Sequence, residues 1–180
     1  METGLLYPYT VYMRMGLMYS LFIIFLINFF IKWWIDSSQY GKNTKRITIF
    51  GTLACLSYAL FVSTLDRKYI NYNISKDSVF FAAIFNTICI YTMMKNIRAV
   101  REKDPYFIGE MSWKLKRVIY AIYMGGIGVG LLIYFGILDI GEVNILEYLT
   151  VTATYLFYWT FIFDFKGYTM DITEFIDVNN

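Results

Sequence analysis

The sequence predicts an all-α, polytopic membrane protein with about five transmembrane helices. Of its 180 residues, 58% are hydrophobic and 17% are charged, whereas roughly a quarter of a soluble protein is charged. The apolar residues also form long stretches without Asp, Glu, Lys or Arg. With flanking residues, each reaches the roughly 17–25 residues that a helix needs to cross a hydrocarbon core of about 30 Å. The five stretches are Met15–Ile31, Ile47–Leu65, Ser78–Met94, Val118–Leu138 and Tyr148–Phe163.

The expected spans lie in a single integral membrane domain that covers residues 1–180. They run over 12–34, 47–65, 78–94, 117–138 and 145–163, and a short acidic tail follows at 164–180. Thr44, Asp77 and Ser112 precede the second, third and fourth spans as expected N-caps. The fifth span is the weakest because Glu147 and several threonines interrupt it. A four-span protein is therefore the main alternative.

The distribution of Lys and Arg predicts the threading. Segments on one side hold four basic residues: Arg14, Arg67, Lys68 and Lys76. Segments on the other side hold twelve: Lys32, Lys42, Lys45, Arg46, Lys95, Arg98, Arg101, Lys103, Lys114, Lys116, Arg117 and Lys166. The positive-inside rule then places the N-terminus outside and the C-terminus inside. Plasma membrane, endomembrane and mitochondrial inner membrane are all compatible with this threading.

The expected loop 95–117 carries seven basic and three acidic residues and shares the inner face with the acidic tail. Three interpretations stay open. The loop pairs with the tail, it lies on anionic lipid headgroups, or its charges only orient the protein. We favour the last, because any polytopic protein needs such charges.

The fourth span contains a cluster of small residues. Ala121 and Gly125 are four residues apart, as are Gly126 and Gly130, and Gly128 lies between the latter two. Small residues at this spacing let a second helix approach closely within a membrane. Helix packing is the favoured role; a hinge or a backbone-lined ion path are the alternatives. The segment Tyr123–Gly126 is similar to a short stretch of small respiratory-complex membrane subunits, and no residue role is taken from it.

Buried polar side chains are the next candidates. Asn28 and Asn86 are the only amides within the charge-free stretches, and an amide in hydrocarbon needs a partner on another helix. Asn86 either holds helices together or contacts a polar substrate. Thr150 and Thr154 lie on one face of the last span, where each hydroxyl is expected to bond to the carbonyl one turn back.

Several classes of chemistry are disfavoured. The chain has no His, which removes the imidazole ligand and the histidine base of many enzymes. The charge-free stretches also contain none of the ionisable groups that proton-coupled transporters place near the membrane midplane. We predict no catalytic residue, metal or cofactor, and no nucleic-acid partner. Cys55 and Cys89 are expected to be free thiols.

These observations favour a non-catalytic multi-pass membrane subunit or scaffold of a larger complex. Its expected partners are the lipid bilayer and other membrane proteins or copies of itself. The alternative is a small oligomeric transporter or channel lined by Asn86, the threonines and the glycines of the fourth span. A lipid-handling enzyme that uses outer-side acids is a third, less favoured class.

Overall fold

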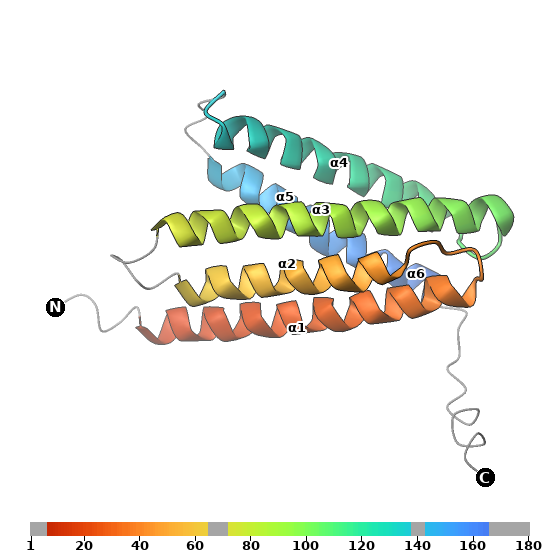
Figure 1. Ribbon diagram of the computed structural model, residues 1–180, viewed down its shortest axis with the longest axis horizontal. Coiled ribbons are helices and arrows are strands. Elements are labelled where there is room, and N and C mark those ends of the chain that lie inside the picture. Colours follow the sequence, from red (N-terminus) through yellow and green to blue (C-terminus); the bar gives the residue numbers. More distant parts are fainter. Residues whose placement is uncertain (1–6, 65–71, 138–142, 166–180) are drawn as a thin grey trace, which may run out of the picture. The chain divides into compact units, whose positions relative to one another are not determined.

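The computed structural model describes residues 7–64, 72–137 and 143–165, and in these ranges every regular element is an α-helix (Figure 1). Four helices, α1 to α4, are long and apolar enough to cross a membrane. The all-helical, membrane-type fold predicted from composition is therefore confirmed at this level. The helices are α1 (Tyr7–Ser37), α2 (Lys45–Thr64), α3 (Tyr72–Lys103), α4 (Glu110–Tyr134), α5 (Val143–Trp159) and α6 (Phe161–Phe165).

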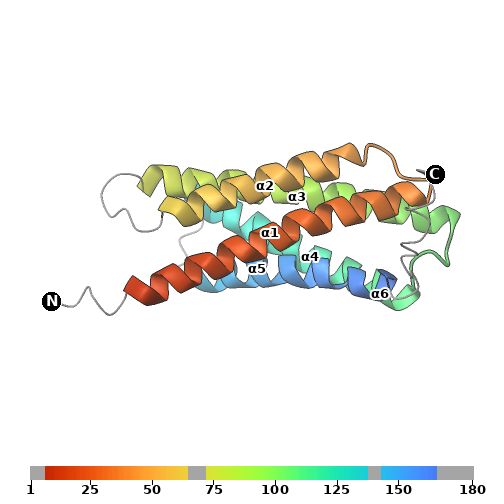
Figure 2. The same cartoon turned by 90° about the horizontal axis from the view of Figure 1, so that it is seen from below.

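The helices form two compact units. The first unit, Met1–Pro105, holds α1, α2 and α3, and α2 packs extensively against both of the others (Figures 1 and 2). The second unit, Tyr106–Asn180, holds α4, α5 and α6, and α4 packs along α5 and contacts α6. Each unit therefore has its own helix-packing interface, built from residues three and four apart on each helix.

The helices extend beyond the predicted apolar spans. Thr44 immediately precedes α2, as expected, but Asp77 lies within α3 and Ser112 within α4, so these two predicted N-caps are wrong. The segment 95–117, expected to be a loop, is mostly helical, since α3 continues to Lys103 and α4 begins at Glu110. Backbone hydrogen bonding continues past the hydrocarbon-length stretches, because Lys, Arg and Glu are good helix formers.

Gly136 ends α4 earlier than predicted. Its φ of 71° lies in the left-handed region, which glycine adopts without strain. Its N–H donates to the carbonyl of Ile133 at 2.9 Å, and the N–H of Ile137 donates to that of Leu132 at 2.9 Å. This pair of bonds is the Schellman arrangement that caps helix C-termini. The helix therefore stops at Tyr134, although the apolar stretch continues.

The fifth predicted span is interrupted. α5 has 17 residues, Thr160 forms a turn, and α6 adds five more residues. Asp164, which the sequence places in the tail, belongs to α6. The remainder of the acidic tail, 166–180, lies outside the described residues, as do the outer-side acids Asp66, Asp139 and Glu142.

Candidate functional site

The buried interface between α4 and α5–α6 in the second unit contains two charged residues, Lys116 and Asp164. The buried residues of α4 recur at intervals of three and four, which places them on one face of the helix; they are Ser112, Lys116, Ile119, Tyr123 and Gly126. A matching buried set on α5, the turn and α6 is Ala153, Phe157, Thr160 and Asp164. Lys116 and Asp164 therefore occupy positions that apolar side chains would normally fill.

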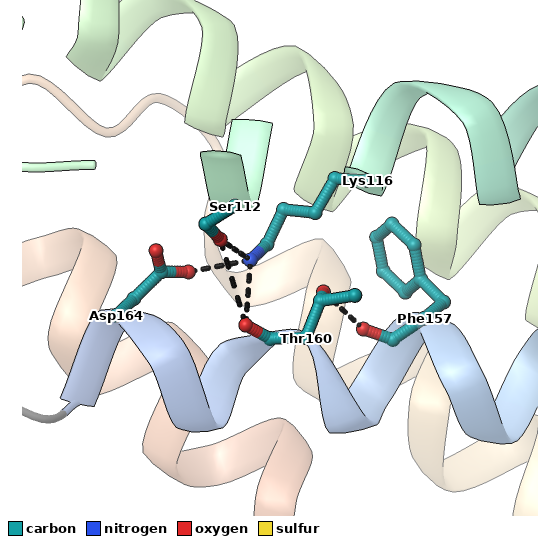
Figure 3. Close-up of polar contacts among 5 residues, drawn as sticks. All are labelled: Ser112, Lys116, Phe157, Thr160 and Asp164. Carbon is teal, nitrogen blue, oxygen red and sulfur yellow. Dashed lines mark hydrogen bonds and ion pairs between the residues drawn. The ribbon is translucent and has the colours of Figure 1, made fainter. Parts of the chain in front are cut away.

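Lys116 is the centre of a closed polar cluster (Figure 3). Its Nζ donates to Asp164 Oδ2 at 2.5 Å, to Ser112 Oγ at 2.7 Å and to the Thr160 carbonyl at 3.2 Å. An ammonium group has three N–H donors, so these acceptors use all of them. The ammonium also lies 4.3 Å from the centre of the Phe161 ring, close enough for a cation–π contact.

The turn at Thr160 supplies one of these acceptors. The Thr160 N–H donates to two carbonyls, those of Leu156 at 3.1 Å and Phe157 at 3.2 Å. The Thr160 hydroxyl also donates to the Phe157 carbonyl, at 2.6 Å. The Thr160 carbonyl accepts the N–H of Phe163 at 3.3 Å, and it also accepts hydrogen bonds from Lys116 and, at 3.5 Å, from the Ser112 hydroxyl. The helix break and the buried lysine thus stabilise one another.

Burial makes this ion pair energetically demanding. The side chains of Lys116 and Asp164 are both 0% exposed. Removing two charges from water is expensive, and their attraction compensates only when geometry and additional hydrogen bonds are good. Asp164 Oδ1 is buried and has no hydrogen-bond partner among the residues that the structure describes. All three donors of the Lys116 ammonium are therefore used, whereas Asp164 Oδ1 remains an acceptor without a donor among the described residues.

This site was not predicted from the sequence. The sequence places Lys116 in the expected inner-side loop 95–117 and Asp164 at the start of the acidic tail, whereas in the structure Lys116 belongs to α4, Asp164 belongs to α6, and neither side chain is exposed. Each lies one or two residues outside a charge-free stretch, so the search for charges within those stretches passed over them. Pairing of the basic segment with the acidic tail was one of three open interpretations and not the favoured one, and the structure shows it for this one pair. A usable signal was that Lys116 continues the spacing of Ile119 and Tyr123.

The glycines of α4 are not equivalent. Gly126 is buried, and a Cβ at this position would lie 2.6 Å from Thr150 Oγ1 on α5. Gly125 and Gly128 are exposed, and a Cβ on either would meet nothing within 4 Å. Successive helical residues turn by about 100°, so these two face away from α5. Gly126 therefore permits the close approach within this unit.

The other small residues of the predicted packing face are less enclosed. Ala121 is exposed and Gly130 is half-buried. Packing of a neighbouring helix on Ala121, Gly125, Gly128 and Gly130 stays a prediction. The Thr154 hydroxyl donates to the Thr150 carbonyl at 3.0 Å, which confirms the expected bond to the preceding turn.

The first unit has a polar core around Asn28. This residue of α1 is 1% exposed, and its Oδ1 accepts a hydrogen bond from Cys89 Sγ of α3 at 3.7 Å. Cys89 Sγ also lies 3.3 Å from the carbonyl of Ile47 on α2. A Cβ at Gly51 of α2 would lie 2.5 Å from Asn28 Nδ2. Three helices therefore meet at this amide.

Two further predictions concern the first unit. Asn86 is 4% exposed on α3, and the choice between a helix contact and a substrate contact stays open. Cys55 and Cys89 are both free thiols, as predicted.

Comparison of the chain with protein-family models, with curated proteins and with solved structures finds no match. Within the described ranges, no three Cys, Asp or Glu side chains are grouped closely enough to hold a metal ion. The geometry of the Lys116 cluster is therefore the main basis for a functional proposal.

Proposed function

We propose that this chain is a five-span integral membrane protein that serves as a non-catalytic structural subunit or scaffold of a larger membrane complex. The observation that carries the proposal is the inward orientation of the Lys116 cluster. All three ammonium donors bind acceptors of the same unit. The buried charges of Lys116 and Asp164 thus stabilise the helix break at Thr160 and hold α4 against α6. This is the arrangement expected of a structural protein.

The exposed surface supports an assembly role. Large apolar side chains are exposed along the membrane-length helices, including Phe22, Phe29 and Phe30 on α1 and Val118 and Ile122 on α4. Such side chains face lipid or other membrane proteins. On α4 they lie beside the exposed small residues, which are suited to close helix contact.

The proposed threading has the N-terminus outside and the C-terminus inside. α5 and α6 together cover 143–165, and a helical path of this length spans about 34 Å, enough to cross a hydrocarbon core of about 30 Å. The turn at Thr160 does not prevent a crossing, because Lys116 and Ser112 donate hydrogen bonds to its carbonyl.

Extraction of native membranes with a mild detergent tests the scaffold proposal. The chain of 21.3 kDa is expected to migrate on native electrophoresis within a larger complex, with partners at constant stoichiometry across purification steps. Gly125→Leu fills an open position on α4 and is expected to reduce that association without lowering the unfolding temperature, because leucine also favours the helix more than glycine does. A lone monomer in every mild detergent would contradict the scaffold role.

A small oligomeric transporter or channel is the second candidate function. It is favoured by the broken helix at Thr160 and by the buried Asp164 Oδ1 beside it, which has no hydrogen-bond partner among the described residues, because transporters bind ions and substrates at such breaks.

Flux measurements in liposomes test the transporter. If the second candidate is correct, Asp164→Asn should reduce flux of the transported solute at least tenfold, whereas Glu110→Gln, in an exposed ion pair on α4, should leave it unchanged. Flux no greater than in protein-free vesicles would exclude a transporter formed by this chain alone.

A further inference from the structure

We propose that the connection between α1 and α2, together with the adjoining part of α3, binds the headgroup of an anionic phospholipid. The proposal rests on the membrane placement described above and adds a partner to it. It concerns the first unit only, and its key residues are Lys42, Lys45, Arg46, Lys95 and Asn96.

The connection has a fixed conformation. Gln39 and Asn43 adopt left-handed backbone angles, with φ of 60° and 56°, which are uncommon for non-glycine residues, although asparagine adopts them more readily than glutamine. A Cβ at Gly41 would lie 2.7 Å from Ile35 Cγ2 and 2.9 Å from Thr44 Cγ2. The loop therefore packs tightly against its own ends.

A buried amide fastens this loop to α3. The backbone N–H of Lys42 donates to Asn96 Oδ1 at 2.7 Å. Asn96 is 3% exposed, and its Nδ2 donates to the Thr92 carbonyl at 2.9 Å, which fixes the orientation of the amide. In Figure 1 the orange connection between α1 and α2 rises to α3 at this end of the unit. The loop is thus preorganised against α3, on which Lys95 precedes Asn96 and is exposed.

The charges held there are not neutralised. Lys42, Lys45, Arg46 and Lys95 are exposed, and none makes an ion pair within the part of the chain that the structure describes. By contrast, Lys32 and Arg98 at the same end are paired, with Asp36 at 2.6 Å and Glu102 at 2.9 Å. Four cations on the loop, the first turn of α2 and α3 therefore have no ion-pair partner among the described residues.

The position of Lys45 and Arg46 strengthens the case for an anion. They lie in the first turn of α2, which contains no acidic residue. A helix N-terminus carries positive partial charge, so it disfavours cations and favours anions. A phosphate group bound here would offset one of the two positive charges of Lys45 and Arg46 and interact favourably with the helix end.

The exposed surface that follows Arg46 along α2 indicates a lipid rather than a free anion. Exposed apolar residues continue along α2 from Arg46 at intervals of three and four, so they share its face; they are Ile49, Leu53, Leu56 and Leu60. Trp33 and Tyr40 are exposed beside the loop, as is typical of residues at the membrane interface. A phosphate at the loop would place its acyl chains along this apolar face.

Lipid binding to the purified full-length chain in nanodiscs tests the proposal. Phosphatidylglycerol is titrated against phosphatidylcholine, and bound lipid is counted by native mass spectrometry. The variant Lys42→Gln/Lys45→Gln/Arg46→Gln should bind phosphatidylglycerol roughly 100-fold more weakly, from the interaction energy of a cation near an anionic membrane surface. Lys103→Gln/Lys114→Gln/Arg117→Gln, which removes the same charge from other exposed positions, should change binding less than about threefold.

A second variant separates geometry from charge. Asn96→Ala keeps every cation but releases the Lys42 N–H, and we expect about tenfold weaker phosphatidylglycerol binding because the loop is no longer preorganised. If the triple variant does not fold, the single exposed change Arg46→Gln gives the same readout, with an expected loss of roughly fivefold.

Several outcomes would overturn the proposal. Equal losses in the loop and control triple variants would show a general charge effect. Competition by inorganic phosphate as strong as that by the lipid would show a free-anion site. Loss of a co-purifying protein with unchanged lipid binding would show an acidic protein partner. Complex size on native electrophoresis, measured on the same preparations, reports on the scaffold proposal separately.

Discussion

Replacing Asp164 with leucine is expected to destabilise the second unit by about 3–5 kcal/mol, because it leaves the Lys116 ammonium buried without its counter-charge. Lys116 would keep Ser112 and the Thr160 carbonyl as acceptors, but neither carries a full negative charge. Unfolding of the purified chain in detergent, followed by tryptophan fluorescence, measures the change.

Two variants control this experiment. Lys116→Met combined with Asp164→Leu removes both charges and should recover most of the lost stability, since apolar side chains often replace a buried ion pair without loss. Glu110→Gln breaks the Lys114–Glu110 pair on the same helix, whose side chains are both 69% exposed, and should change stability by less than about 0.5 kcal/mol. A single Asp164→Leu variant as stable as the natural chain would mean that the pair does not form.

Replacing Gly126 with leucine is expected to destabilise the second unit by about 1–3 kcal/mol, because an added side chain must displace α5. A Cβ alone would lie 2.6 Å from Thr150 Oγ1. The same unfolding measurement in detergent reports the change.

Gly128→Leu is the matched control. It lies two residues along the same helix, where an added Cβ meets open space. Because leucine is also a better helix former than glycine by about 1 kcal/mol, this variant should be as stable as the natural chain or more so. The opposite order of the two variants would show that α5 packs on a different face of α4.

The features predicted correctly from the sequence are those that depend on residues close together in the chain. Apolar stretches of bilayer length located all the long helices, and the free thiols and the Thr154 back-bond were also expected. Errors arose at the helix ends. Asp77 and Ser112 have the residue types of N-caps, but the helices begin earlier, because cap preference is weak where adjacent residues also support helix.

The glycine cluster shows the limit of spacing arguments. Two pairs at four-residue spacing marked two neighbouring faces of one helix as equally suitable for packing. The structure places α5 against Gly126, where a Cβ would lie 2.6 Å from Thr150 Oγ1, and not against Gly125 or Gly128. Sequence spacing identifies candidate faces, whereas the position of the neighbouring helix selects one.

The sequence by itself determined that the chain folds into long apolar helices, since both helix hydrogen bonding and hydrocarbon length are properties of contiguous residues. It did not determine which charges are buried. Lys116 and Asp164 are 48 positions apart in the chain, and each resembles an ordinary charge at the end of an apolar stretch. Only the packing of α4 on α5 and α6 removes both from solvent, because a buried charge is tolerated only where a distant partner is brought within hydrogen-bond distance.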